Sequence, residues 1–165
     1  MMRFGILVAF IFSICPVSMN AQIKDLEALC SSIKDKVVVS QYPVKLSRDE
    51  IYVDECEFRF STKRSKYIRL EVEKFESDAA AFIELKSRKE SFGGRDALEY
   101  KDKKTRDRRV EIDPNGFWDS AEAYRNIAVP DHFILLRRGK YVILILGDNF
   151  SEMKKTERLL RGITF

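Results

Sequence analysis

The sequence predicts an α+β domain in which three helices flank an antiparallel sheet, in the order helix, two strands, helix, three strands, helix. Three observations support this prediction. Apolar residues recur at spacings of three and four in some segments and alternate in others, and tight turns rather than long crossovers separate the strands. The chain has 165 residues and no internal repeat. One domain of ordinary size therefore accounts for it.

The first 21 residues have the layout of a secretory signal peptide. A short basic start, Met1–Arg3, precedes an apolar run over Phe4–Ile14 and a polar tail that ends in a small residue, Ala21. The apolar run is shorter than the roughly 20 residues that cross a bilayer. We expect cleavage after Ala21, which leaves residues 22–165 as a periplasmic or secreted domain with no transmembrane segment.

Cleavage removes Cys15 and leaves an even pair, Cys30 and Cys56, in an oxidising compartment. We expect a disulfide between them, which adds roughly 3 kcal/mol of stability in the chain-entropy model. The alternative is two buried free thiols, because free cysteine is a common core residue. A lipid anchor on Cys15 is not expected, because bacterial lipoprotein signals have a small residue where this chain has Ile14.

Residues 23–35 show the apolar spacing of an amphipathic helix, with Cys30 on its buried face. One or two short strands are expected around 37–39 and 51–53. From Cys56 the apolar period changes to two, so that this cysteine points the same way as two phenylalanine rings. Both thiols therefore belong to core-facing surfaces, as a disulfide between a helix and a strand requires.

The run 68–73 alternates apolar and charged residues, which predicts a half-buried strand with one face towards water or a partner. Ser77 or Asp78 can cap a second helix that passes through Leu85. The pair Gly93-Gly94 is expected to end that helix with a left-handed stop.

A strand is predicted over Phe117–Arg125. The segment 132–147 follows as a hairpin that turns at Arg138-Gly139. Residues 141–146 are apolar on both faces, so this strand should be central and covered on both sides. Asn149 and Glu152 have the spacing of a capping box that opens the last helix.

Five short motifs are spaced along the mature chain: Leu29-Cys30, Cys56-Glu57-Phe58, an alternating strand that ends at Phe75, the stretch 116–124, and the hairpin 136–142. Together they resemble small exported bacterial domains of mostly unassigned function, among them actinobacterial lipoproteins and extracellular sensor domains of receptor kinases. The resemblance implies a fold like that of PsbP and Mog1, in which helices flank an antiparallel sheet, and implies no shared catalytic residues. The chain lacks a lipid-attachment box, so partners do not follow by analogy.

Residues 101–109, called the basic segment below, have a local net charge of +4. Its cations could attract an anionic envelope polymer, a lipid headgroup or an acidic protein. The alternative is a solvated loop or edge strand that resists aggregation by its charge. Basic residues of the 136–142 hairpin and of the last helix would strengthen the binding interpretation if they shared a face with the segment. The candidate binding residues in the segment are Lys103, Lys104, Arg106, Arg108 and Arg109.

Trp118 is the sixth candidate, because it and its aromatic neighbours could line a cleft for a hydrophobic or sugar ligand. Such residues more often fill the core. His132 can be drawn into a hydrolase triad with Asp119 or Asp131, but no serine lies in the Gly-x-Ser-x-Gly elbow of such enzymes. With one histidine in the chain and two cysteines expected in a disulfide, we expect no metal site and no cofactor.

The net charge of the whole chain is only +4 at pH 7, too mild to indicate nucleic acid as a partner. We therefore expect an exported binding domain rather than a catalyst, one that contacts an anionic envelope component. An enzyme with a cleft near Trp118 and a structural or assembly subunit are the alternatives. A deep polar cleft around Asp119 and His132 would favour the enzyme, and a large exposed apolar patch would favour the subunit.

Overall fold

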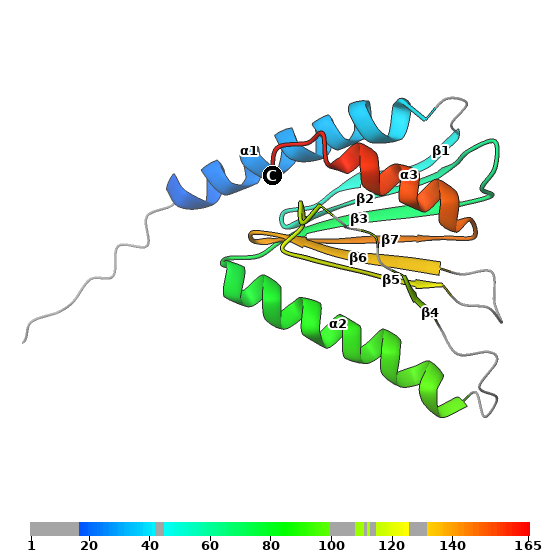
Figure 1. Ribbon diagram of the computed structural model, residues 1–165. Helices are drawn as coiled ribbons and strands as arrows, with labels where there is room; N and C mark the ends of the chain where they lie inside the picture. The colour runs from blue at the N-terminus through cyan, green and yellow to red at the C-terminus, as the bar shows by residue number, and fades with distance from the viewer. Residues whose placement is uncertain (1–16, 42–44, 100–107, 111, 113–114, 126–131) are drawn as a thin grey trace, which may run out of the picture.

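One antiparallel sheet forms the centre of the molecule, with strand order β1-β2-β3-β7-β6-β5-β4 (Figure 1). The computed structural model describes residues 17–41, 45–99, 108–110, 112, 115–125 and 132–165. Within them the elements are α1 (Val17–Ile33), its π-helical continuation η1 (Lys34–Val39), β1 (Lys45–Ile51), β2 (Glu55–Ser61), β3 (Ile68–Lys74), α2 (Asp78–Glu99), β4 (Arg108–Val110), β5 (Ser120–Arg125), β6 (His132–Arg138), β7 (Tyr141–Gly147) and α3 (Phe150–Leu160).

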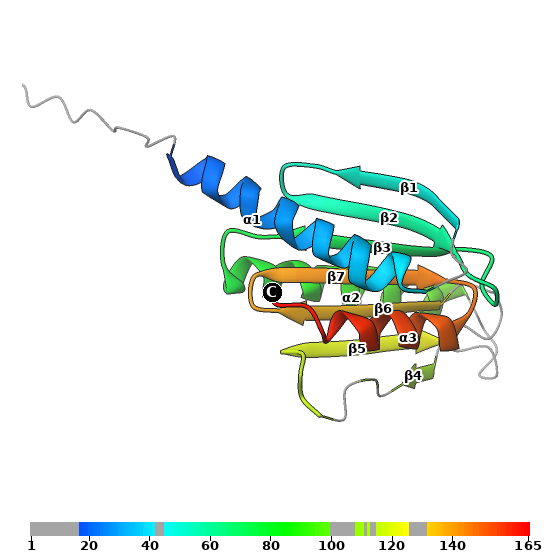
Figure 2. The same cartoon turned by 90° about the horizontal axis from the view of Figure 1, so that it is seen from above.

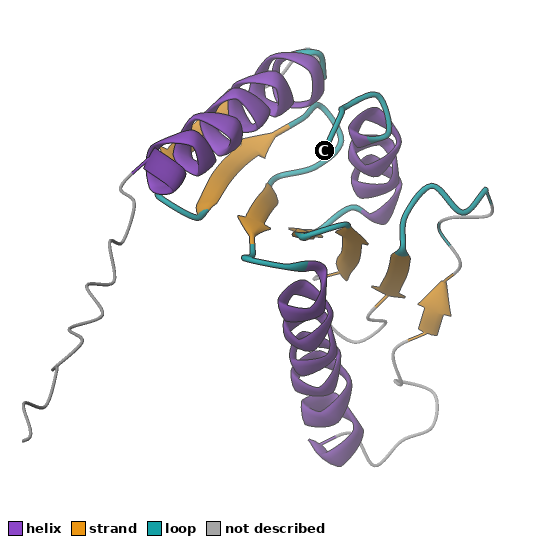
Figure 3. Ribbon diagram, turned by 90° about the vertical axis from the view of Figure 1, so that its left-hand side faces the viewer, coloured by secondary structure: helices purple, strands orange, loops and turns teal. Residues whose placement is uncertain are grey.

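The helices cover the sheet from both sides. Helices α1 and α3 lie side by side on one face, and α2 crosses the other (Figures 1 and 2). The end-on view in Figure 3 shows the resulting three layers. The predicted α+β class is confirmed, with three helices in the described parts of the chain. The sheet has two more strands than the predicted order counts. One is β1, which ends at Ile51, whereas a short strand was expected around 51–53, and the other is the short β4.

Alternation along the strands decides which residues enter each layer. On β3, Ile68, Leu70 and Val72 are fully buried towards α1 and α3, and the charged residues between them point to the other face. Strand β7 lies between β3 and β6, and Tyr141 to Ile145 are buried on both of its faces. The prediction of a central strand covered on both sides is confirmed.

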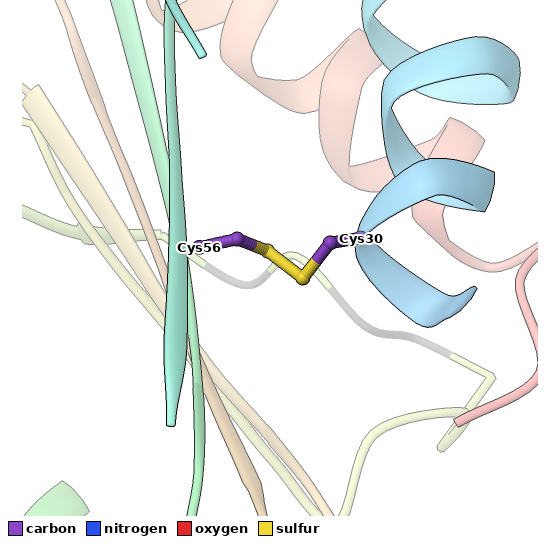
Figure 4. The surroundings of a disulfide bond; sticks show 2 residues. All are labelled: Cys30 and Cys56. Atoms are coloured by element: carbon purple, nitrogen blue, oxygen red, sulfur yellow. A yellow bond between two sulfur atoms is a disulfide. The ribbon is translucent and has the colours of Figure 1, made fainter. Parts of the chain in front are cut away.

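A disulfide joins Cys30 of α1 to Cys56 of β2, as predicted (Figure 4). Both residues are fully buried, and their Cα atoms are 6.3 Å apart. The bond fixes the first helix to the sheet through the same layer that holds the main apolar core. Its position follows from the two apolar patterns, since the helical and the alternating residues face each other across this layer.

Three local predictions were wrong. Residues 37–39 form part of η1 rather than a strand, because burial of Val37 and Val38 against the core overrides the strand preference of three consecutive valines. Gly93 and Gly94 do not end α2, which continues to Glu99, since a glycine in a helix interior costs only about 1 kcal/mol. In the second half of the chain, β5 begins at Ser120 rather than Phe117.

The turn that the sequence predicts near the end of the chain is present, and so is the Asn149 half of the predicted capping box. Gly139 joins β6 to β7 with φ of 53°, a conformation that glycine adopts readily. The Asn149 side chain accepts hydrogen bonds from the backbone N–H groups of Ser151 and Glu152 and so caps α3. The Glu152 carboxylate accepts a hydrogen bond from Thr62, on the turn between β2 and β3.

Part of the predicted signal peptide, residues 1–16, lies outside the described residues, and residues 17–21 begin α1. The expected cleavage after Ala21 therefore stays a prediction. No helix within the described residues is both long and apolar enough to cross a membrane.

Candidate functional site

A cleft of about 780 Å³ opens where α1, the β6–β7 turn and the last residues of the chain meet. Asp25, Ser32 and Lys36 line it from the first helix and its continuation. Residues 138–141 line it from the turn, and Thr164 and Phe165 from the end of the chain. Figure 2 shows these three parts together, with the C-terminus beside the β6–β7 turn and below α1.

A second hollow of about 330 Å³ shares Arg138, Thr164 and Phe165 with the first. It extends the depression towards Phe117 and Arg161. We refer to the two hollows together as the hairpin-tip cleft. Its walls come from segments that are far apart in the sequence.

The β6–β7 turn that forms one wall is held in place by hydrogen bonds. The Gly139 N–H donates to the Asp119 carboxylate at 2.6 Å, and the Arg138 guanidinium donates to the Phe117 carbonyl at 2.6 Å. The same guanidinium lies 5.0 Å from the centre of the Phe117 ring. A wall fixed in this way loses little conformational freedom when a ligand binds.

The cleft has a mixed charge. Lys36, Arg138 and Lys140 contribute cations, and Asp25 and Asp78 contribute carboxylates. Next to Asp25, the Lys74 side chain is only 6% exposed, with its Nζ 4.0 Å from the Asp25 carboxylate.

Burial affects ionisation around this part of the cleft. It lowers the pKa of the Lys74 amine, and the neighbouring Lys140 lowers it further, while Asp25 opposes both effects. Burial also raises the pKa of the Tyr141 hydroxyl, with a smaller contribution from Asp25. Both shifts disfavour the charged form of the side chain. The Tyr141 hydroxyl is therefore a neutral hydrogen-bonding group at neutral pH.

Trp118 does not line the cleft. It is 5% exposed, and its indole N–H donates to the buried Glu157 carboxylate at 2.6 Å. Its ring packs edge-on against Phe117 and Phe165, with centroids 4.9 and 5.5 Å away. These two neighbours do line the cleft. The sequence left open whether Trp118 lines a cleft or fills the core. Its position is that of a core residue whose N–H group has a hydrogen-bond acceptor.

Only the last two residues of the basic segment are among the residues that the structure describes. Lys103, Lys104 and Arg106 lie outside the described residues. Arg108 and Arg109 belong to β4, the edge strand, and pair with Arg125 and Tyr124 of β5.

The hairpin tip lies at the opposite end of the sheet from these two arginines. Arg125 pairs with His132 at the start of β6, whereas Arg138 is the last residue of that strand. Seven residues of strand correspond to roughly 20 Å. Arg108 and Arg109 are therefore not brought together with the cations of the turn. Among the described basic residues of the last helix, Arg161 at the end of α3 lines the cleft.

Asp119 and His132 are also at opposite ends of β6. The Asp119 N–H donates to the Arg137 carbonyl at 2.9 Å, one residue before the tip, and His132 packs edge-on against Phe150 near the start of α3. A catalytic triad that uses His132 with Asp119 therefore does not assemble. Asp131, the other candidate partner, lies outside the described residues. No group of three or more potential metal ligands occurs among the residues that the structure describes.

The charged face of β3 is occupied by ion pairs. Arg69 pairs with Glu57 and Glu71, and Arg88 of α2 pairs with Glu73 and with Glu84. Burial raises the pKa of the Glu71 carboxyl, although the two arginines oppose this effect. The face that the alternating sequence left open to water or a partner is thus partly covered by α2 and partly filled by side-chain pairs.

Sequence reasoning missed Asp25, Lys36 and Asp78 as parts of the candidate site. On the sequence they are ordinary polar residues of helix surfaces, and no local motif marks them. The signal that could have found them is indirect. The central position of β7 brings its turn with β6 under the first helix, and the closing helix returns the chain end to the same place.

Comparisons with known proteins leave the family of the chain open. No protein-family model matches it. No curated protein matches it to a significant degree either. Among solved structures, it is similar to a GTP binding regulator from Thermotoga maritima, with 12% sequence identity and a TM-score of 0.44, over 82% of this chain and 90% of that one. A likeness this distant supports no statement about function, and the kinship with small exported bacterial domains stays a resemblance.

Proposed function

We propose that the chain is an exported binding domain that recognises an anionic component of the cell envelope through the hairpin-tip cleft. The observation that carries this proposal is the gathering of Lys36, Arg138 and Lys140 around one cleft from two separate parts of the fold. Cations at a preformed concave surface attract anions and hold them with charge-assisted hydrogen bonds. The layout of residues 1–21 supports export, and the Cys30–Cys56 disulfide agrees with it.

The direct test neutralises the cleft and measures retention on an anionic matrix. The double variant Lys36→Gln with Lys140→Gln should elute at a clearly lower salt concentration than the parent chain, because fewer cations attract the matrix and less salt is needed to screen the remaining attraction. The matched control is Lys63→Gln with Lys66→Gln. Both control lysines are exposed, and they lie on the β2–β3 turn at the other end of the sheet. Equal losses in the two double variants would mean that retention reflects net charge rather than the cleft.

The basic segment is tested separately. Replacing Lys103, Lys104, Arg108 and Arg109 together by glutamine should weaken retention if this end of the sheet adds a second contact. Unchanged elution would assign the interaction to the cleft alone.

The intact mass of the exported protein tests the compartment. A mass that begins at Gln22, with no free thiol before reduction, is the expected result. A retained leader or two free thiols would remove the basis for an envelope partner.

Assembly with other chains is a second candidate function, because several large apolar side chains are exposed. Phe82 and Ile83 of α2 are 56% and 68% exposed, and Val53 on the β1–β2 turn is 65% exposed. Sedimentation over a range of protein concentrations distinguishes this candidate. A monomer at all concentrations would leave binding through the cleft as the preferred function.

A further inference from the structure

We propose that the hairpin-tip cleft takes a short stretch of a linear acidic polysaccharide, which names the ligand class of the binding function proposed above and rests on it. The three observations that favour this class are the mixed charge of the lining, the size of the cleft, and the absence of exposed large apolar residues from its described walls.

The mixed charge is the first step. Asp25 and Asp78 line the same cleft as Lys36 and Lys140. A carboxylate accepts hydrogen bonds and repels other anions. A phosphodiester or a sulfate ester has no proton to give to Asp78 and is repelled by it. A sugar acid satisfies both kinds of group, because its carboxylates meet the lysines and its hydroxyls donate to the aspartates.

The size of the cleft is the second step. Its two hollows have volumes of about 780 and 330 Å³, and both border Arg138, Thr164 and Phe165. A single phosphate group occupies a small part of the larger hollow, whereas two or more sugar rings fit within it. The hydroxyl of Thr164 and the half-buried ring of Phe165 lie at the junction. There the Thr164 hydroxyl can donate a hydrogen bond to the ligand or accept one from it.

The surroundings are the third step, and they disfavour a lipid headgroup. A protein that binds headgroups usually inserts apolar side chains beside the charged site. The exposed large apolar residues of the described chain lie elsewhere, and none lines the cleft: Val39, Ile51, Tyr52, Val53, Tyr67, Phe82 and Ile83. A polymer that remains in water suits this surface better than a membrane.

Three probes of similar length separate charge from hydroxyl content. A hexamer of galacturonic acid has both, its methyl ester keeps the hydroxyls without the charge, and a linear polyphosphate of six units has charge alone. Calorimetry on the disulfide-bonded chain at low salt should show binding of the galacturonate hexamer that is about tenfold or more tighter than that of either other probe. Vesicles that contain anionic lipid are the fourth probe and should bind no more tightly than the methyl ester.

Two variants sharpen the result. Lys140→Gln should weaken the galacturonate hexamer about tenfold, while Lys63→Gln leaves its affinity unchanged. Asp78→Ala should weaken the galacturonate hexamer and strengthen polyphosphate, because it removes a hydrogen-bond acceptor for one and a repulsive charge for the other. This opposite response is specific to a site that reads hydroxyls as well as charge.

The outcomes separate the two proposals. Polyphosphate or anionic vesicles that bind as tightly as the galacturonate hexamer, or an Asp78→Ala variant that binds every anion more tightly, would overturn the polysaccharide inference and leave the anion-binding function intact. Binding of none of the anionic probes would overturn both. Selective binding of the hexamer that depends on Lys140 and Asp78 would support both.

Discussion

The two faces of the sheet differ in how their area is used. Beneath α1 and α3 the apolar core spans the sheet from β2 to β5 and includes the disulfide. Beneath α2 the apolar cluster of the described side chains comprises residues of β6, β7 and the first part of the helix, and the area over β2 and β3 carries ion pairs such as Arg69 with Glu57. One helix is too narrow to cover a sheet of this width. The comparison teaches that the first face supplies most of the stability, and that charged pairs complete the second.

A cavity in the first face should therefore cost far more than a similar truncation on the outside of the second. Phe58 is fully buried under α1, and Phe82 on α2 is 56% exposed. Phe58→Ala should lose about 3–5 kcal/mol of unfolding free energy in urea, and Phe82→Ala should stay within about 0.5 kcal/mol of the parent. Similar losses for the two would contradict the proposed division between the faces.

Removal of the disulfide tests the same face without a cavity of comparable size. The variant with Cys30→Ala and Cys56→Ala should unfold with about 3 kcal/mol less free energy than the oxidised parent. Reduction of the parent chain is the control, since it breaks the same bond with no change of sequence. A loss below about 1 kcal/mol would show that packing alone holds α1 in place.

The polar contact inside the first face should have an intermediate effect. Trp118→Phe keeps an aromatic ring but removes the N–H group that donates to Glu157, a residue that is 1% exposed. A buried carboxylate that loses a donor costs about 1–3 kcal/mol. Circular dichroism during urea unfolding measures the change. A variant as stable as the parent would mean that Arg161, which donates to the same carboxylate at 2.8 Å, is sufficient for it.

The second face should show the smallest effect and a dependence on pH. Burial raises the pKa of Glu71, so its charged form is disfavoured in the folded state, and wild-type stability from this group increases as the pH falls towards the unfolded value of 4.5. Glu71→Gln should gain on the order of 0.5 kcal/mol at pH 7 and nothing below pH ~4. Unfolding in urea at the two pH values provides the measurement. A loss at pH 7 would show that the pairs with Arg69 and Arg88 outweigh burial.

The parts of the fold that the sequence predicts are those set by local periodicity. The alternation of Cys56, Phe58 and Phe60, the apolar strand at 141–146 and the glycine turn at Gly139 each follow from neighbouring residues. The prediction of a strand at 37–39 was wrong, because the strand preference of valine is weak compared with the burial of Val37 and Val38 against the core. Trp118 stayed ambiguous because the same aromatic residue can form a core or a binding surface.

The cleft could not be predicted from the sequence for a different reason. Its walls come from residues 25–36, Asp78, 138–141 and 164–165, and only the order of the strands brings them together. The candidate residues of the basic segment were chosen for the charge density of neighbouring residues, which is a local property. The two that the structure describes, Arg108 and Arg109, lie at the other end of the sheet from the cleft.

The disulfide also decides how the domain responds to a pull on its N-terminal side. Because Cys30 is linked to Cys56, tension applied along α1 passes directly into β2, in the body of the sheet. The 26-residue separation between the cysteines cannot be drawn out, which withholds roughly 90 Å of slack. Once the bond is reduced, the same pull can draw out that stretch of chain.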